Sequence, residues 1–384
     1  MYRNVKDQMT NCKCFEPFIL AAAFLAFVLF GMGVYADAAD QWQLALEPRA
    51  WIFPRDHGAH PEYRTEWWYF TGNLKDDTGN RYGYQLTFFR HGLREQTGSN
   101  ANAWSVRDIY SAHFTIIDVS TGQFLMDERM SRSGPGLAGA LTEQMHVWLF
   151  NWKAKMEENT IFLEAQNDEL QLKLELKPRK PLVFHGDRGL SKKGSGKGQA
   201  SYYTSFTDLE TRGSIQTKPN GPQISVQGTS WFDHEFGSTQ LSRDQEGWDW
   251  FGLHLSDGRD LMIYLLRKTD KTINQESSGT IIEPDGSFRH LKLSDFSVTI
   301  LDTWKSPKSS GQYPCKWRIA IPSNQIDILI SPLVPDQELD TRQSTGIIYW
   351  EGAVAGKGTS GGRAVQCEGY VELTGYAGSL GGIF

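Results

Sequence analysis

Clustered positive charge is scarce in this chain, and the shortage excludes one class of function. The 384 residues carry 39 Lys and Arg against 45 Asp and Glu, a formal net charge of −6. Nucleic-acid binding depends on clustered Lys and Arg that neutralise phosphates. The short basic spots at 177–180 and 192–193 are more typical of solvated loops. We therefore expect no nucleic-acid partner.

Apolar runs long enough to span a membrane are also missing. The run at 18–30 is shorter than the roughly 20 residues of a spanning helix. It follows Arg3, Lys6 and Lys13 and precedes the small-residue pattern Ala36-Asp37-Ala38. This order is typical of a cleavable secretory signal peptide. We expect cleavage after Ala38 and a periplasmic or secreted mature protein; an uncleaved anchor, which would keep it membrane-associated, is the alternative.

Cysteine is rare, with four residues in the whole chain. Cys12 and Cys14 would leave with residues 1–38, so only Cys315 and Cys367 would remain in the mature protein. An exported protein meets an oxidising environment, in which paired cysteines persist as disulfides. The sequence therefore predicts that a disulfide, if one forms, joins Cys315 to Cys367.

Helical periodicity is weak, and short segments at 123–131 and 335–345 are the best candidates for helices. Many short apolar runs instead alternate with Gly, Asn, Asp and Ser turns, which indicates strands in a sandwich or barrel. We predict an all-β fold of two antiparallel β-barrel or sandwich domains with few short helices. The Gly-, Ser- and Lys-rich segment 186–199 is expected to be a mobile surface loop.

The chain also contains an internal echo. The stretch WWYFTGNL at 67–74, an Asp/Gly turn and an apolar strand ending at Arg90 parallel WDWFGLHL at 248–255, a turn and a strand ending at Arg267. A duplication would leave this trace, although aromatic hairpins also agree by chance. On this basis we divide the mature chain into domains at 39–240 and 241–384.

Acids and tryptophans are concentrated at 231–267, around the motif WFDHEFG at 231–237. Along a strand successive side chains point to opposite faces. Trp231, Asp233 and Glu235 therefore share one face, and His234 lies on the other. Carboxyl groups among aromatic rings suit a pocket that binds an apolar molecule and does acid–base chemistry on it.

Four segments together resemble the AttH-like and carotenoid 1,2-hydratase (hydroxyneurosporene synthase) family. They are HPEYRTEWWYFTGNL at 60–74, WFDHEFG at 231–237, the segment from GWDWF at 247–251 through Arg267, and the C-terminal pair YWEG at 349–352 and GYVELTGY at 369–376. The resemblance implies two lipocalin-like domains packed together, with an apolar ligand site between or inside them. It also implies a spread of activities, from hydration of a terminal carbon–carbon double bond in carotenoids to cycloadditions in polyketide pathways.

Hydration of an isolated alkene needs a strong general acid, aromatic faces to stabilise the cation, and a base that directs water. We predict Asp233 as the acid, with His234, Glu235 or Asp249 relaying protons or orienting water. The ligand-binding candidates are Glu66, Trp67, Trp68, Tyr69, Trp231, Trp248, Trp250, Tyr349 and Trp350. The alternative is that the acids are structural, paired with Arg64, Arg90 or Arg267, and that the tryptophans pack the core.

No cofactor is expected. The GPGLAG stretch at 134–139 lacks the βαβ unit that a dinucleotide-binding motif requires. His57 and His60 lie on a Pro/Gly-rich loop rather than on the helix of a zincin motif, and Glu62, His234 and Glu235 add no standard ligand spacing, so no metal site is predicted.

Two hypotheses for function follow. The first is an exported enzyme that adds water to an apolar isoprenoid, lipid or polyketide-like molecule, or isomerises or cyclises it. The second is a non-catalytic lipocalin-like carrier that hands a hydrophobic ligand to a membrane-associated transporter. Acids facing an aromatic cavity favour the enzyme, whereas a wholly apolar cavity favours the carrier.

Overall fold

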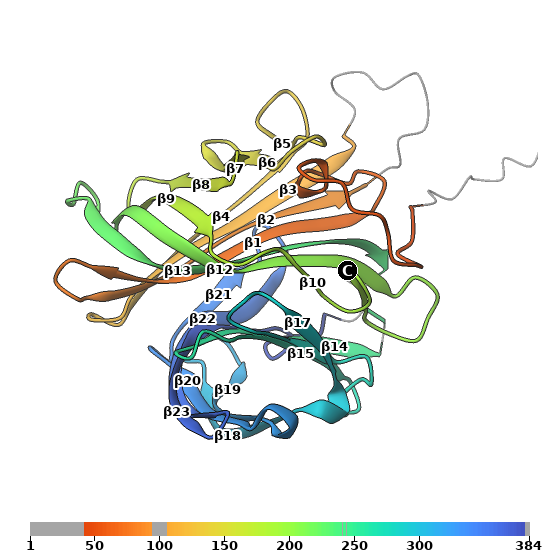
Figure 1. Ribbon diagram of the computed structural model, residues 1–384. Coiled ribbons are helices and arrows are strands. Elements are labelled where there is room, and N and C mark those ends of the chain that lie inside the picture. The colour runs from red at the N-terminus through yellow and green to blue at the C-terminus, as the bar shows by residue number, and fades with distance from the viewer. Residues whose placement is uncertain (1–41, 94–105, 240, 243, 381–384) are drawn as a thin grey trace, which may run out of the picture. The chain divides into compact units, whose positions relative to one another are not determined.

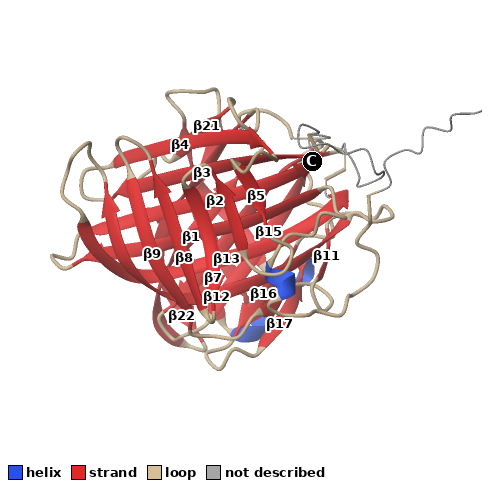
Figure 2. Cartoon of the chain, turned by 90° about the horizontal axis from the view of Figure 1, so that it is seen from above, coloured by secondary structure: helices blue, strands red, loops and turns tan. Residues whose placement is uncertain are grey.

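A computed structural model describes residues 42–93, 106–239, 241–242 and 244–380. The signal peptide expected at 1–38 lies outside the described residues, so cleavage and export stay predictions. None of the helices in the described part of the chain combines the length and apolar character that crossing a bilayer requires. Figure 2 shows that strands make up almost all of the regular structure.

The described strands form two curled antiparallel sheets (Figure 1). The first has 13 strands: β1 (Thr65–Asp76), β2 (Arg81–Gly92), β3 (Asp108–Asp118), β4 (Gln123–Arg132), β5 (Ala138–Ala140), β6 (His146–Leu149), β7 (Trp152–Glu157), β8 (Thr160–Gln166), β9 (Gln171–Pro178), β10 (Val183–Phe184), β11 (Leu190–Lys192), β12 (Ala200–Gln216) and β13 (Ile224–Thr239). The second has 10 strands: β14 (Gln245–Leu255), β15 (Asp260–Lys268), β16 (Ser278–Ile282), β17 (Phe288–Lys292), β18 (Ser297–Lys305), β19 (Gln312–Ile321), β20 (Ile326–Pro332), β21 (Glu338–Thr341), β22 (Ile347–Ser360) and β23 (Arg363–Leu373). This all-β architecture confirms the predicted fold class.

The two sheets share one strand order. The first runs β4-β3-β2-β1-β13-β12-β9-β8-β7 before its last short strands, and the second runs β17-β16-β15-β14-β23-β22-β20-β19-β18. In each, a four-stranded meander comes first and the last strand of the half returns to pair with the first. This agreement favours duplication over chance as the origin of the echo between β1 and β14.

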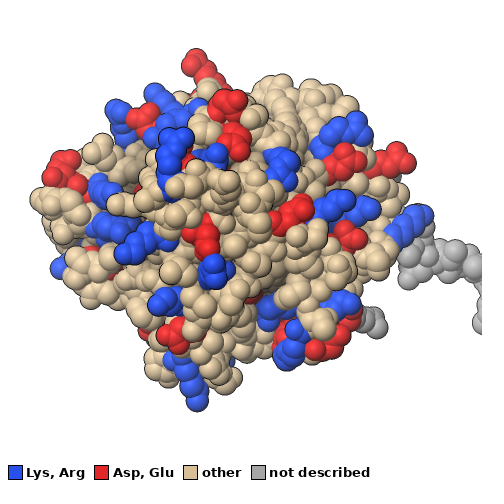
Figure 3. All heavy atoms as spheres, turned by 60° about the horizontal axis from the view of Figure 1, so that its bottom comes forward, with Lys and Arg blue, Asp and Glu red and all other residues tan. Residues whose placement is uncertain are grey.

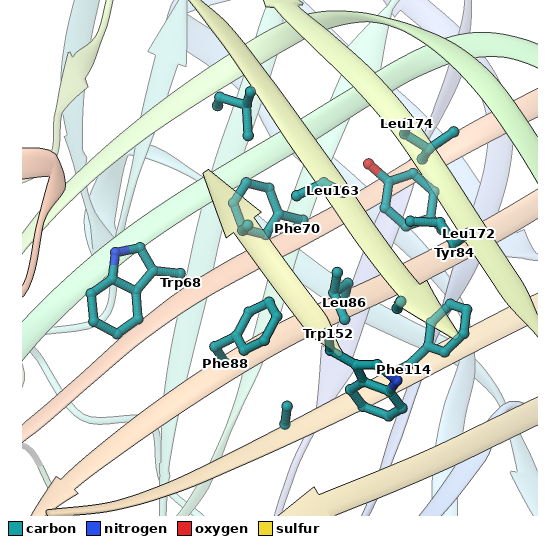
Figure 4. Packing of buried hydrophobic residues seen from close by; sticks show 14 of the residues in the cluster. Trp68, Phe70, Tyr84, Leu86, Phe88, Phe114, Trp152, Leu163, Leu172 and Leu174 are labelled. Atoms are coloured by element: carbon teal, nitrogen blue, oxygen red, sulfur yellow. The ribbon is translucent and has the colours of Figure 1, made fainter. Parts of the chain in front are cut away.

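The first core lies inside the curl of the first sheet. Trp68 and Phe70 of β1 point into it, together with Phe114 of β3, and they meet Trp152 of β7 and leucines of β8 and β9 (Figure 4). Each fully buried side chain of this size contributes about 1.5–3 kcal/mol relative to an exposed one. A second core fills the curl of the second sheet, around Phe251, Trp317 and Trp350.

A third apolar cluster lies where the outer face of the first sheet meets the second sheet. It joins Tyr69 and Trp231 of the first sheet to Trp250, Tyr264 and Tyr370 of the second. Strands β1 and β13 are thus covered on both faces, which explains why they read as continuous aromatic runs rather than as alternating patterns. Residues Trp42–Phe384 form one compact unit.

The chain passes from the first sheet to the second between Thr239 and Gln245. Polar contacts join the sheets as well: Asn73 Nδ2 donates to the Gly369 carbonyl at 3.0 Å, and Lys180 Nζ lies 2.6 Å from Asp260. The division at residue 240 remains a prediction about folding units.

Three expectations about local structure were wrong. Both candidate helical segments contain strands, β4 and β21, and the helices in the described residues are three single 3-10 turns at Arg55–His57, Leu293–Asp295 and Pro322–Asn324. Segment 186–199 contains β11, which pairs with β12, and Lys193 beyond it is only 7% exposed.

The predicted disulfide is also wrong, because Cys315 and Cys367 are both free. Cys315 lies in β19 and Cys367 in β23, and β22 and β20 stand between these two strands. Three strand spacings of roughly 4.8 Å exceed the reach of about 7 Å that a disulfide allows between Cα atoms.

Candidate functional site

A cavity of about 90 Å³ lies between the two sheets. A single water molecule needs roughly 10–15 Å³, so the cavity has room for a small organic group or for several waters. Strands β1, β2, β3, β12 and β13 of the first sheet and β14, β15, β22 and β23 of the second contribute side chains to its wall. The wall consists of Trp67, Tyr69, Gln85, Thr87, Phe89, His113, Lys193, Tyr203, Asp233, Glu235, Leu241, Trp248, Trp250, Tyr264, Leu266, Thr345, Ile347, Tyr349 and Glu372.

Strand alternation decides which residues of the motif at 231–237 reach this cavity. On β13, Asp233 and Glu235 face it, and the antiparallel partners of these residues on β1 are Tyr69 and Trp67. On β14, Trp248 and Trp250 face it in the same way. Of the predicted residues, the structure therefore brings together Trp67, Tyr69, Asp233, Glu235, Trp248, Trp250 and Tyr349.

Asp233 is held by three donors. Tyr203 OH and Trp231 Nε1 each lie 2.6 Å from its carboxyl oxygens, and the Ser205 hydroxyl donates to the same group. Trp250 Nε1 donates in turn to Tyr203 OH at 3.0 Å, which fixes the phenol. Burial raises the pKa of Asp233 to about 7 in spite of these donors, because desolvation of the charge outweighs them.

Glu235 has a different environment from Asp233. Lys193 Nζ lies 2.9 Å from Glu235 Oε1, and the Ser201 hydroxyl donates to the same oxygen. Lys193 also lies over the ring of Tyr264, 4.1 Å from its centroid. The two carboxyls of β13 thus have different partners. Glu235 forms an ion pair with Lys193, whereas Asp233 has no cationic partner among the described residues.

Glu372 is a third carboxyl in the wall, contributed by β23 of the second sheet. Trp248 Nε1 donates to its Oε2 at 2.8 Å. Burial raises the pKa of Glu372 to about 7, and the charges of Asp233 and Glu235 act in the same direction. Glu351 pairs directly with Glu372 in the sheet register, and burial, followed by the charge of Glu372, raises its pKa well above the usual range.

A neutral polar group lies elsewhere in the wall. His113 Nδ1 lies 2.8 Å from Tyr349 OH, and Gln85 Nε2 donates to the same hydroxyl at 3.1 Å. Burial lowers the pKa of His113 to about 3, so its ring is neutral at physiological pH. This group can orient a polar atom without adding charge.

His234, predicted to relay protons, does not face the cavity. It lies on the opposite face of β13, where its Nε2 is 2.9 Å from Glu66 Oε1 and its ring stacks on Trp68. Glu66 also contacts His60 at 2.9 Å and Arg90 at 3.1 Å. Glu66, Trp68 and His234 therefore belong to a buried network beside the first core, and the structural alternative describes them better.

Asp249 does not face the cavity either. Its carboxylate accepts a hydrogen bond from Arg267 Nε at 2.8 Å and others from Tyr376 OH at 3.0 and 3.1 Å. Alternation places it on the face of β14 opposite to Trp248 and Trp250. The structure therefore does not bring Asp249 into the site, and its ion pair with Arg267 favours the structural alternative.

Two predicted aromatic residues lie outside the wall. Trp231 donates a hydrogen bond to Asp233 without lining the cavity itself, and its ring centroid lies 5.8 Å from that of Trp250. Trp350 packs in the second core and donates to the Pro335 carbonyl at 2.8 Å.

Lys193, Tyr203 and Glu372 were not predicted. Lys193 lies in a segment with the composition of a loop, and Tyr203 lies in an ordinary strand. The spacing of neither residue indicates a functional role. Glu372 had a signal, because GYVELTGY at 369–376 lies in a segment of the family resemblance and its alternation places the glutamate opposite an aromatic strand.

One group of described residues has the geometry of a cation site. Donor atoms of His60, Glu66 and His234 lie within 4.8 Å of one another, and all three side chains are buried. The Arg90 guanidinium is also buried and pairs with Glu66 and with Asp108. Since Arg90 already supplies positive charge to Glu66, the residues fit an ion-pair network better than a metal site.

The outer surface carries mixed charge. On the face shown in Figure 3, basic and acidic side chains are interspersed, and no large area has one sign. Attraction of a charged partner by a broad electrostatic field is therefore not a feature of this face.

Comparison with known proteins identifies relatives of the whole described chain. The AttH-like family model matches residues 44–376. The crystal structure of an AttH protein from Nitrosomonas europaea is 34% identical, covers 87% of this chain and 99% of its own, and superposes with a TM-score of 0.77. Kievitone hydratase from Nectria haematococca is 17% identical, with 88% and 95% covered and a TM-score of 0.65, which shows a shared fold. No curated protein matches the chain.

Proposed function

Because the chain belongs to the AttH-like family, we propose that it is a hydratase-type enzyme, a hydro-lyase that adds water to a carbon–carbon double bond of an apolar molecule. The molecule would be isoprenoid, lipid or polyketide-like, as in the carotenoid 1,2-hydratases that the sequence resembles. It would bind in the cavity between the sheets. The observation that carries this proposal is Asp233, a carboxyl group with a pKa of about 7 in an aromatic wall.

The first chemical step would be protonation of the double bond by Asp233. A carboxyl with an ordinary pKa would be ionised at neutral pH and could not donate, whereas burial keeps part of the Asp233 population protonated. The proton leaves the Asp233 oxygen, a new C–H bond forms, and the alkene π electrons leave the other carbon positive. The hydrogen bonds from Tyr203 and Trp231 stabilise the carboxylate that remains.

The second step would be capture of the cation by water. Trp67, Trp248 and Trp250 line the cavity, and the negative faces of indole rings stabilise a cation by roughly 0.5–2 kcal/mol each. Water forms the C–O bond and gives up its proton to the Asp233 carboxylate, which restores the acid, so that the net change is the addition of one H and one OH. If water is excluded, loss of a proton or ring closure of the same cation would isomerise or cyclise the ligand instead.

The alternative function, a hydrophobic carrier for a membrane-associated transporter, predicts a wholly apolar cavity. Three carboxyls and one ammonium group in the wall argue for the enzyme. Export and the link to a transporter remain proposals that follow from the leader at 1–38 and from the family.

The decisive experiment starts from the native ligand. The protein is purified from its source and the co-extracted molecule is identified by mass spectrometry. That molecule is then incubated with the wild type and with Asp233→Asn in isotopically labelled water. The proposal predicts label in a product of wild type that is heavier by one water, and none with Asp233→Asn. Binding without any change of the ligand by the wild type would support the carrier.

A further inference from the structure

The charges around the cavity do not balance. Asp233, Glu235 and Glu372 line it, and Glu351 lies beside Glu372 on the neighbouring strand. Lys193 is the one Lys or Arg among the described residues of the wall, and it is already paired with Glu235. Asp233 and Glu372 in the wall, and Glu351 beside it, therefore have no cation of their own among the described residues. Burying a carboxylate in this way is costly, so each must hold a proton or meet a positive charge.

Two of these carboxyls occupy equivalent places in the duplicated sheets. In the first sheet Tyr69 of β1 is opposite Asp233 of β13, and in the second Trp250 of β14 is opposite Glu372 of β23. The echo aligns Tyr69 with Trp250, because each has a tryptophan two positions before it and a phenylalanine directly after it, in WWYF at 67–70 and WDWF at 248–251. Each carboxyl also accepts a hydrogen bond from an indole, at 2.6 Å for Asp233 and 2.8 Å for Glu372. Each sheet thus contributes one of these two equivalent acids to the cavity wall.

The hydroxyl of Tyr69, a wall residue that is only 6% exposed, has no hydrogen bond of normal geometry among the described residues. The same holds for both carboxyl oxygens of Glu351, which is 1% exposed, lies outside the wall, and is close enough to Tyr69 for each group to shift the pKa of the other. Buried polar groups are normally satisfied, and leaving one unpaired costs about 1–3 kcal/mol. The indole rings of Trp67, Trp248 and Trp250 complete an aromatic cage, and the acids belong to the same cavity wall.

We propose that this cavity is a cation-binding site, in which Asp233 and Glu372 together bind one positively charged carbon or nitrogen atom that carries alkyl substituents. The cation is either the protonated alkene of the proposed reaction or a trialkylammonium group of a bound ligand. Aromatic cages that recognise choline use the same combination of ring faces and charge. This inference shares its cavity with the proposed function and deepens it, but it does not require turnover.

The test uses choline and its neutral isostere 3,3-dimethylbutan-1-ol, which have the same shape and differ by one charge. Binding of each to the full-length protein is measured by calorimetry or by tryptophan fluorescence at pH values below and above 7. Choline affinity is expected to rise about tenfold for each carboxyl that ionises between one pH unit below and one above a pKa of about 7. The affinity of the alcohol is expected to stay constant.

Other titratable groups that face the two acids do not produce this dependence. Lys193 is held charged by Glu235, and burial keeps His113 neutral with a pKa of about 3. Burial raises the pKa values of the cage phenols well above the ordinary range, which applies to Tyr69, Tyr203 and Tyr349. Burial, followed by the charge of Glu372, raises the pKa of Glu351, which faces Glu372 from β22, well above the usual value.

Glu372→Gln keeps the shape of the side chain and removes its charge. It should weaken choline binding above pH 7 about tenfold and leave the alcohol unaffected. Glu283→Gln, which removes a carboxyl of the same sheet that pairs with Arg259 near the surface, is the matched control and should change neither affinity. If Glu372→Gln does not fold, the pH dependence of the wild type still decides the matter.

Equal affinity for choline and the alcohol at every pH would overturn the inference, as would equal loss of both ligands in Glu372→Gln. Preference for choline in a protein that leaves its co-purified alkene unchanged would support the cation site and reject the proposed hydration. Hydration without any preference for choline would do the reverse, so the two proposals fail separately.

Discussion

At the scale of single residues, burial and pairing separate the acids of this protein into two kinds. Asp233 and Glu372 face an aromatic cavity and have pKa values raised to about 7 by burial. Asp249 is as deeply buried but faces Arg267, 2.8 Å away. The same residue type therefore lies in the proposed site in one place and in an ion pair with arginine in another.

Asp233→Asn should abolish turnover while folding is retained. Loss of a general acid lowers rates by about 10²–10⁴-fold. The amide oxygen can still accept from Trp231 Nε1, while the amide NH2 donates to Tyr203 OH instead of accepting from it. Turnover of the wild type should fall as the pH rises through about 7, because the donor ionises. Rate measurements across this pH range, together with thermal melting of both proteins, check this. A melting temperature that drops sharply would reassign Asp233 to the scaffold.

Asp233 should also leave a signature in stability. Its pKa is about 7 in the folded protein and near 3.8 when exposed, so the folded state binds the proton more tightly. The contribution of this group to stability is complete below pH 3.8 and is lost as the pH rises through 7. Urea unfolding at several pH values should show a shallower decline over this range in Asp233→Asn than in the wild type; identical slopes would contradict the assignment.

Asp249→Asn is expected to have the opposite phenotype. Breaking this part-buried ion pair leaves Arg267 with only the more distant Glu246, 3.9 Å away, and costs about 1.5–3 kcal/mol. Affinity for a ligand of the cavity should remain, because Asp249 faces away from it. Urea unfolding measures the first effect and fluorescence titration the second. Lost binding in a stable variant would return Asp249 to the site.

At the scale of elements, β1 and β13 do two things at once. One face of the pair, with Trp68 and Phe232, closes the first core, and the other, with Tyr69 and Asp233, forms part of the cavity wall. Glu66 lies on the core face and ties β1 to β2 and β13 through Arg90 and His234. The site is therefore held by central strands rather than by loops, which gives it a rigid frame.

Glu66→Gln tests this frame. Removing the charge leaves Arg90 buried with one partner fewer, and such breaks cost about 3–5 kcal/mol. Chemical denaturation should show the loss. Glu164→Gln, which breaks a half-exposed pair with Lys153 in the same sheet, is the control and should cost under about 1 kcal/mol. A loss as small as the control would mean that the network contributes little.

Much of this arrangement could be predicted at the level of elements, and less at the level of the site. Turn signals and alternation predict the strands, and alternation places Asp233 and Glu235 on one face and His234 on the other. The sequence could not show that both faces of β13 are buried in different surroundings. The partner of Asp249 is 18 residues away on β15, and Lys193 reaches the cavity from a segment with loop composition, so neither contact has a local signal.

At the scale of the whole molecule, two sheets of one strand order form a cavity between them, and each supplies an acid to its wall. Duplication explains how a site with two similar carboxyls arises, since equivalent strands bring equivalent positions together. Changes confined to Asp233 and Glu372 can then alter the chemistry without altering the fold.

The free cysteines offer a test at this scale. Cys315 is partly exposed and Cys367 is buried. Reductant should leave the melting temperature unchanged, and a thiol reagent should modify Cys315 in the folded protein and Cys367 only after unfolding. Mass spectrometry of the modified peptides shows which of the two cysteines has reacted in the folded and in the unfolded protein. Recovery of a peptide that links the two cysteines would restore the predicted disulfide.

The central claim is that the Asp233 carboxyl is held partly protonated at neutral pH within the aromatic cavity. The most direct measurement is a titration of this group by carbon NMR of labelled aspartate, with Asp233→Asn used to identify its signal. The account predicts a midpoint near 7. A midpoint near 3.8, the value of an unperturbed aspartate, would contradict it.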